Sequence, residues 1–261
     1  MDEAALLAVL EPLAIMAMLA LARAGGLILA LPHAASPAIP RQVRALLILS
    51  LTLSLVGVAT PPSLPHLDII GLVLAMMGEA LVGLALGFVV QIALAGIRMA
   101  GELIGVEIGL SFSAVADPAN PGASTATASL LGHLGVQLFF ALGIDRALIG
   151  GLAHSMRMIP LGTGRIGGDT VATLAEQSGH ALEVALHLAL PVLATGLAVK
   201  LALAVLARFV PKLQIFGLAF AITLAAGLVA LHRALPSLGE AVARHLWDAV
   251  AAFDRVIATL S

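Results

Sequence analysis

The chain has 261 residues, of which 61% are hydrophobic and 11% are charged, and its mean hydropathy is +1.10. A soluble domain has about a quarter charged residues and buries an adequate core without so large an apolar excess, so part of the apolar surface must face something other than water. The formal net charge of −2 excludes a strongly basic nucleic-acid binder. Because the chain has no cysteine, disulfides, thiolate catalysis and Cys-based metal sites are also excluded.

Six stretches along the chain are apolar enough to form membrane-level helices. They cover about residues 12–31, 45–60, 69–97, 128–151, 181–207 and 213–231. Pro12 suits the first turn of the first helix. Acidic Asp2 and Glu3 stand where a signal peptide needs positive charge, so we expect the first stretch to remain in the mature protein. The second stretch is short for a span, because about 20 residues cross the hydrocarbon core.

Three further segments differ in composition from these stretches. A Gly-rich region covers residues 98–117, and it leads into a loop at 118–122 whose prolines no helix can accommodate. A polar segment with four glycines at 162–168 precedes the fifth stretch. From residue 236 onward, spacings of three and four place the apolar residues on one helical face, namely Val242, Leu246, Val250, Phe253, Ile257 and Leu260. We expect this helix to pack on the rest of the molecule, since a membrane-surface helix would be richer in Lys and Arg.

The loop charges give no membrane orientation. With six spans, the loops on one side would carry five Lys and Arg and those on the other side six, so the positive-inside rule shows no bias. This balance indicates that some stretches are re-entrant hairpins or are buried in an assembly. The single Trp and the absence of Tyr have two interpretations: the apolar surface meets other protein, or the composition is simply biased toward Ala and Leu.

Ionisable residues within apolar stretches are expensive at membrane depth and are candidates for function. They are Arg23, Glu79, Glu102, Glu107, His133, Asp145, Glu183, His187 and Lys200. One interpretation is a proton-coupled small-solute transporter that uses Glu79, Glu183, His187 and Lys200. The other interpretation is that these groups make polar contacts within a multi-subunit assembly. Their spread over five stretches favours the assembly, because a proton relay would concentrate them on facing surfaces.

Other site chemistries have little support. His180, Glu183 and His187 share one helical face through spacings of three and four, so a metal site is geometrically possible. Two imidazoles and a carboxylate would still need further ligands, and the HExxH motif is absent. We therefore predict no metal and no cofactor. Since no nucleophile triad, Walker motif or GxGxxG is present either, we do not expect an enzyme.

Glycines at intervals of four carry a packing signal. Gly83 and Gly87 form one such set, and Gly101, Gly105 and Gly109 form another. Small residues at this spacing form a groove that lets another backbone approach closely. The second set leads into a semi-polar loop with one bulky aromatic residue.

Two segments around these glycines form recognisable motifs: the run from Gly78 through Glu79 to Phe88, and Gly101-Glu102 with Gly109-Leu110-Ser111-Phe112. The first resembles the signature, and the second the central motif, of the FliR family of flagellar export-apparatus proteins. Further matches are Arg23-Ala24-Gly25-Gly26 with Pro32 and the run from Arg41 to Arg44, then Ser155 to Gly162, and Arg208-Phe209-Val210-Pro211 with Phe216. Each motif is weak alone, but their order and spacing span nearly the whole chain.

The resemblance implies an all-α membrane protein of about six hydrophobic helices arranged as kinked or re-entrant hairpins. Residues 1–180 would be a FliP-like part that includes the Gly-rich helix and plug loop at about 98–122, and residues 181–261 would be a FliQ-like hairpin with an amphipathic C-terminal helix. In the family, the loop after the Gly-rich helix enters the channel as a plug. By position it is Leu110, Ser111, Phe112, Ser113 and Ala114 here.

The implied function is that of a non-enzymatic subunit of the flagellar type III protein export gate. It would assemble with FliP and FliQ in the bacterial inner membrane at the flagellar basal body, with FlhB and FlhA as further partners and unfolded substrates passing transiently. The alternative within the same fold is the injectisome (SctT) paralogue.

Overall fold

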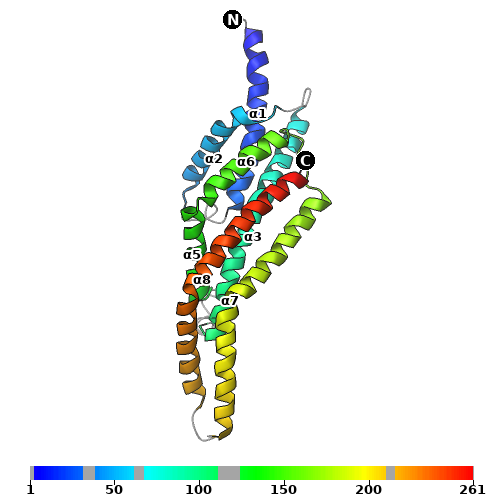
Figure 1. The fold of residues 1–261 in the computed structure, drawn as a ribbon. Helices are drawn as coiled ribbons and strands as arrows, with labels where there is room; N and C mark the ends of the chain where they lie inside the picture. The colour runs from blue at the N-terminus through cyan, green and yellow to red at the C-terminus, as the bar shows by residue number, and fades with distance from the viewer. Residues whose placement is uncertain (1–2, 32–38, 62–67, 111–123, 210–214, 261) are drawn as a thin grey trace. The chain divides into compact units, whose positions relative to one another are not determined.

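The computed structural model describes residues 3–31, 39–61, 68–110, 124–209 and 215–260. Its secondary structure in these residues is helical (Figure 1). In chain order the elements are α1 (Glu3–Ala30), α2 (Arg41–Leu55), the 3-10 turn η1 (Val56–Val58), α3 (Ile69–Ile108), α5 (Ala126–Ala141), α6 (Ile144–Met158), α7 (Gly168–Phe209) and α8 (Ile215–Thr259). The expected all-α fold is confirmed.

The described residues contain five helices long and apolar enough to cross a membrane. The pair α5 and α6 raises the number to six if it is counted as one broken span, since the two helices are bent by 63°. The bend occurs at Gly143, whose φ of 71° lies in the left-handed region, where glycine carries no Cβ penalty. The expected stretch at 128–151 is therefore two helices rather than one.

Several helices are longer than the sequence predicted. The Gly-rich region does not interrupt α3, which continues through it to Ile108. α7 begins at Gly168, within the expected polar segment, and α8 joins the sixth stretch and the amphipathic tail into one helix with Pro236 inside it. Pro12 likewise lies inside α1 rather than in its first turn. In each case a single proline or a short polar run is too weak a break to end a long helix.

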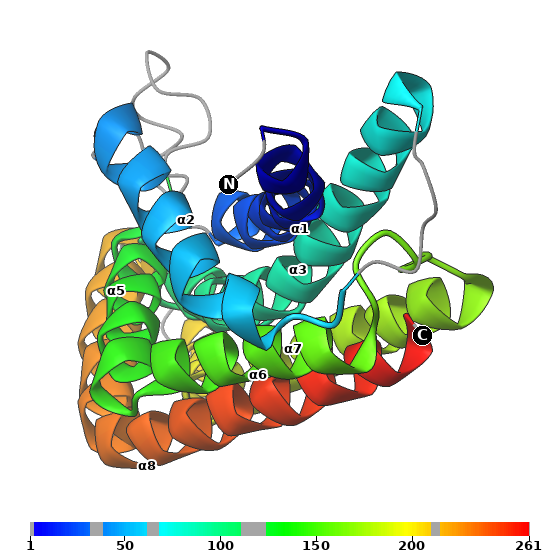
Figure 2. The ribbon, with the colours of Figure 1, turned by 90° about the horizontal axis from the view of Figure 1, so that it is seen from above.

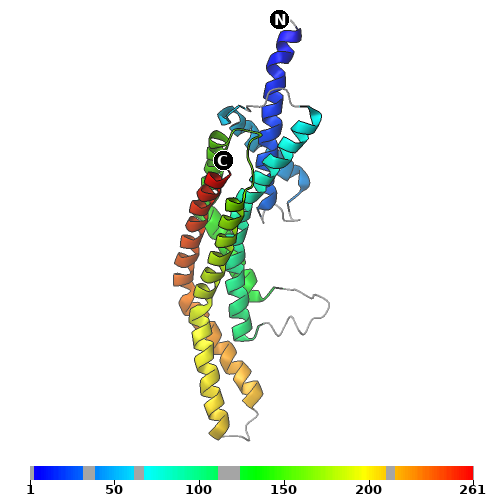
Figure 3. The same cartoon turned by 90° about the vertical axis from the view of Figure 1, so that its right-hand side faces the viewer.

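The chain forms two compact units. Unit 1 contains Met1–Ile92, Gly143–Gln177 and Asp248–Ser261, and unit 2 contains Ala93–Leu142 and Ser178–Trp247. In unit 1, α6 runs alongside the C-terminal part of α8 (Figure 2), where Gly151 faces the ring of Phe253. In unit 2, the second half of α7 and the first half of α8 form a hairpin (Figure 3). The FliP-like and FliQ-like division at residue 180 remains a prediction.

The C-terminal amphipathic helix packs on the rest of the molecule, as expected. The predicted apolar face is largely buried, with Val242 fully buried, Leu246, Phe253 and Leu260 each 1% exposed, Ile257 3% exposed and Val250 half-buried. Trp247, which lies outside that face, is 48% exposed. The interpretation as a packed helix is confirmed.

Candidate functional site

In unit 1, a buried ion pair joins α1 and α3. Arg23 donates through Nε to a carboxylate oxygen of Glu79, and both side chains are fully buried. Arg23 also donates through Nη1 to the carbonyl oxygen of Ser155 at 2.9 Å and to that of Ile159 at 3.4 Å. The other carboxylate oxygen of Glu79 accepts the backbone N–H of Gly162 at 2.7 Å.

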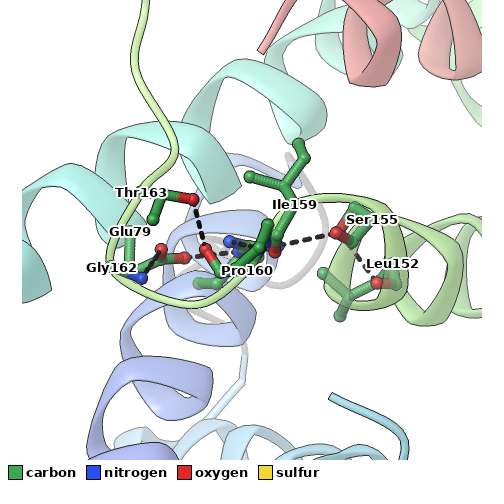
Figure 4. A network of polar contacts seen from close by, with 8 residues as sticks. Glu79, Leu152, Ser155, Ile159, Pro160, Gly162 and Thr163 are labelled. Carbon is green, nitrogen blue, oxygen red and sulfur yellow. Dashed lines mark hydrogen bonds and ion pairs between the residues drawn. The ribbon is translucent and has the colours of Figure 1, made fainter. Parts of the chain in front are cut away.

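This cluster uses a specific backbone turn after α6 (Figure 4). Ile159 ends the helix in an extended conformation, and Gly162 has a φ of 89°, in the left-handed region that favours glycine. The last turn of α6 aims the carbonyl group of Ser155 at the guanidinium, and the turn after it aims the carbonyl group of Ile159 at the guanidinium and the N–H of Gly162 at the carboxylate. Because burying a charge is costly unless it is paired and hydrogen-bonded, these contacts make the buried pair tolerable.

Glycines let α1 and α3 cross at backbone contact beside this pair. A Cβ on Gly83 would lie 2.8 Å from the backbone nitrogen of Leu27, and one on Gly87 would lie 2.8 Å from its carbonyl oxygen. From the opposite side, a Cβ on Gly26 of α1 would lie 2.9 Å from the backbone nitrogen of Leu84. The groove at Gly83 and Gly87 is therefore filled by another helix of the same chain.

In unit 2, the first turn of α5 is fastened to α3. Thr125 caps α5, its hydroxyl accepting the N–H of Ala128 at 3.2 Å, and its own N–H is donated to Glu102 Oε1 at 3.2 Å. The Thr127 hydroxyl donates to the carbonyl oxygen of Gly101 at 2.7 Å. Both threonines are buried, 5% and 4% exposed.

The glycines of α3 make room for these contacts. A Cβ on Gly105 would lie 2.6 Å from the hydroxyl oxygens of both Thr125 and Thr127, and one on Gly101 would lie 2.8 Å from the N–H nitrogen of Ala128. The α3 helix then ends before Gly109, whose φ is 87°. We call the contacts of Gly101, Glu102 and Gly105 with Thr125 and Thr127 the loop base, because they hold together the chain segments on either side of residues 111–123.

The predicted plug lies mostly outside the described residues. Ser111, Phe112, Ser113 and Ala114 are not described, and Leu110 follows the end of α3 with its N–H donated to the carbonyl oxygen of Gly105 at 2.9 Å. Arg208 is exposed in the last turn of α7, where its positive charge interacts favourably with the helix dipole.

Two further pairs of ionisable residues lie close together, one partly buried and one exposed. Lys200 Nζ lies 2.8 Å from Glu107 Oε1, so these two residues, like Arg23 and Glu79, form an ion pair. His180 lies 3.6 Å from the exposed carboxylate of Glu183, and within the described ranges there is no group of three or more His, Cys, Asp or Glu that could hold a metal. The sequence identified these charged residues as candidates but not their pairing, nor the part played by Thr125, Thr127 and the carbonyl groups at the end of α6.

The fold and these contacts define a multi-pass helical membrane protein. Its glycines let its own helices pack at close range, and some of the charged residues within its apolar helices form ion pairs. The family described as "Bacterial export proteins, family 1" matches residues 14–249. The flagellar biosynthetic protein FliR of Escherichia coli strain K12 is 30% identical over 230 residues, which cover 88% of this chain and 87% of that protein. FliR of Pectobacterium carotovorum is 35% identical over 175 residues, 67% of each chain, and FliR of Caulobacter vibrioides is 29% identical over 225 residues, 85% of this chain and 89% of that protein.

The chain belongs to the FliR family of bacterial export proteins. It is therefore a component of the flagellar export apparatus and a multi-pass protein of the bacterial inner membrane. The relatives named above are flagellar rather than injectisome proteins.

Proposed function

We propose that the chain is a non-enzymatic subunit of the flagellar export gate and assembles with FliP and FliQ, and with FlhB and FlhA, into a protein-conducting channel. The observation that carries the proposal is one face of α7, which we call the α7 face. Its leucines, Leu186, Leu190, Leu197 and Leu201, are 46%, 54%, 59% and 61% exposed. Glu183, 63% exposed at the side chain, continues the same helical spacing.

The composition of the α7 face favours a protein neighbour over lipid. Leucines alone would suit acyl chains equally well, but an ionised carboxylate does not lie against acyl chains without a large penalty. A neighbouring subunit can cover the leucines and supply a polar partner for Glu183. The α7 face is therefore suited to contact with a neighbouring subunit, as a subunit of a multi-subunit gate requires.

The plug is the finer part of the proposal. Residues 110–114, with Phe112 as the bulky member, would close the channel at rest, since a narrow apolar constriction excludes water and so stops ions. Support comes from the loop base. Its hydrogen bonds join the end of α3, which precedes the loop, to the start of α5, which follows it. Anchoring both ends of the loop on α3 would hold a plug at one place in the channel.

Two experiments test the proposal. Tagged FliP should co-purify with this chain when FliQ is co-expressed, and the chain should be degraded faster when it is expressed alone. Deleting residues 110–114, or substituting Phe112→Gly, should make cells leak ions through the assembled gate. Stable accumulation of the chain by itself as a monomer contradicts the assembly, and unchanged ion permeability in a gate that still assembles contradicts the plug.

A further inference from the structure

The end of α3 is held by four residues of the α7–α8 hairpin, which we call the α3 socket. It consists of Gly196 and Lys200, one turn apart on α7, and Phe220 and Gly227, two turns apart on α8. The last two residues of α3, Glu107 and Ile108, and the following Gly109 each meet at least one of them.

Two glycines shape the α3 socket. A Cβ on Gly196 would lie 2.7 Å from Cγ and 2.8 Å from Cδ of Glu107, so a larger residue there would displace that side chain. A Cβ on Gly227 would lie 3.1 Å from Cβ of Ile108, which is 1% exposed. The Phe220 ring lies against Gly109, 3.0 Å from where a Cβ would be. These apolar contacts shape the socket but do not fix the register of α3 within it, because dispersion contacts do not depend on orientation.

The ion pair between Glu107 and Lys200 supplies the directional contact. Their atoms Oε1 and Nζ are 2.8 Å apart, and the side chains are 16% and 51% exposed. Glu107 is the penultimate residue of α3, where a negative charge is unfavourable toward the carboxyl end of the helix dipole. The mostly buried carboxylate therefore depends on the Lys200 ammonium group, whereas Lys200 is the more exposed of the two and its flexible stem can take the ammonium group to another polar partner.

We propose that the Glu107–Lys200 pair is a positioning pair, which fixes the register of the end of α3 in the α3 socket and thereby sets where the loop after α3 begins. A single polar contact within an apolar interface is the best-attested way to select one register among several of similar packing energy. The consequence for channel closure rests on the proposed function, but the register itself does not.

Paired cysteines can measure the register, because the chain has no cysteine of its own. The reporter pair is Ile108→Cys with Gly227→Cys, whose Cβ atoms would be 3.1 Å apart, and the control pair is Gly96→Cys with Ala181→Cys, also 3.1 Å apart, further back along α3 and α7. Both separations are slightly below the Cβ separation of about 3.5–4.5 Å in a disulfide, so each pair needs the same small outward shift and the two rates can be compared directly. Oxidation is followed on the full chain in membranes that contain the assembled export apparatus.

The expected result is that Lys200→Met slows formation of the reporter disulfide by about fivefold or more, as loss of a coupled contact predicts, and leaves the control disulfide unchanged. Lys200→Arg, which keeps the charge, should restore the reporter rate. Glu107→Gln should slow the reporter disulfide less than Lys200→Met does. It leaves the half-exposed lysine without a counter-charge, whereas Lys200→Met leaves the mostly buried carboxylate without one. A reporter disulfide that forms at the same rate with the parent lysine, with Lys200→Met and with Lys200→Arg would overturn the proposal.

Ion leakage in the same strains separates this inference from the proposed function. If Lys200→Met slows the reporter disulfide and cells also leak ions, the register and the closed channel are linked. A slower reporter disulfide in cells that do not leak supports the positioning pair and counts against the plug. An unchanged reporter disulfide overturns the positioning pair whatever the leakage.

Discussion

Arg23 and Glu79 depend on each other because each is an ionised group that the chain buries completely. Removing one leaves the other without a counter-charge, which costs about 3–5 kcal/mol, whereas replacing both with apolar residues is often close to neutral. We expect Arg23→Met and Glu79→Gln each to lower the thermal midpoint of the purified protein strongly, with Glu79→Gln also weakening the acceptor of the Gly162 N–H. The measurement is the loss of folded protein on heating in detergent.

The double variant Arg23→Met/Glu79→Met is the control for that prediction. It keeps the side-chain volume and removes both charges, so it should be more stable than either single variant. The Arg23 contacts to the carbonyl groups of Ser155 and Ile159 are also lost, so full recovery to the parent value is not expected. A double variant less stable than both single variants would show that the pair is not the main source of the effect.

Gly83 tests the close approach of α1 and α3. A Cβ there would lie 2.8 Å from the backbone nitrogen of Leu27, and backbone cannot move aside as a flexible side chain can. Gly83→Ala should therefore destabilise the protein by about 1–3 kcal/mol, the usual range for overpacking. Gly179→Ala in α7 is the matched control, because nothing lies within 4 Å of its added Cβ, and alanine favours a helix by about 0.5–1 kcal/mol over glycine.

The comparison is made on thermal midpoints of the two purified variants. Gly83→Ala should melt below the parent protein and Gly179→Ala at or slightly above it. Equal midpoints for the two variants would mean that α1 and α3 do not approach as closely as the contact at Gly83 requires.

At the level of single residues, the sequence predicts which groups matter better than it predicts their partners. Arg23 and Glu79 stand out because ionisable groups are costly within apolar stretches. They are 56 positions apart, and the partner of a charge is set by how helices cross, which no local pattern records. The carbonyl groups of Ser155 and Ile159 carry no side-chain signal at all, although the Ser155–Gly162 segment already resembled a family motif.

At the level of elements, α5 depends on a cap that also belongs to the loop base. The Thr125 hydroxyl accepts the N–H of Ala128, and loss of an N-cap side chain costs about 1 kcal/mol. Thr125→Ala should therefore speed amide hydrogen exchange in the first turn of α5 by about fivefold, as that free energy implies. Mass spectrometry of the protein in detergent measures it peptide by peptide.

Thr195→Ala is the control for the cap. The Thr195 hydroxyl is exposed in the interior of α7 and donates to the carbonyl oxygen of Pro191 one turn earlier, so its removal should leave exchange in α5 unchanged. Exchange in the first turn of α5 that is the same in Thr125→Ala as in the parent protein would show that Glu102 and Thr127 hold the loop base without the cap.

Helix type was predictable from composition, but helix length was not. Long runs of Ala, Leu, Val and Ile predict helices at membrane depth, and these are present. The sequence predicted breaks at the polar run before residue 181 and near Pro236, whereas α7 and α8 continue through both. A helix already held by packing on both sides of one proline loses little by continuing, and this tertiary support is not visible in a local window.

At the level of the whole molecule, the helices differ in how much of their apolar surface the chain itself covers. The 18-residue apolar window of α3 is 67% buried, whereas that of α7 is 22% buried. Glycines of α3 are in contact with α1, α5 and α7, although the first half of α3 still carries exposed residues such as Ile69 and Leu74, 83% and 62% exposed. The α7 face, where Glu183 and the exposed leucines are uncovered by the chain, is one of the surfaces that a neighbouring protein can cover.

A photo-activated amino acid in place of Leu197 can identify what covers the α7 face. Leu197 is 59% exposed on that face, so the probe should give discrete protein adducts in cells that make FliP and FliQ, and these adducts should disappear when both are deleted. Leu188, on the same helix but 3% exposed, provides the buried control and should give no adduct with a partner. The reason is the carboxylate of Glu183 on the same face, which is costly against acyl chains and acceptable beside a polar group of a neighbouring protein. Adducts that are only to lipid at Leu197, in the presence of both partners, would mean that α7 faces the bilayer and that the assembly uses another surface.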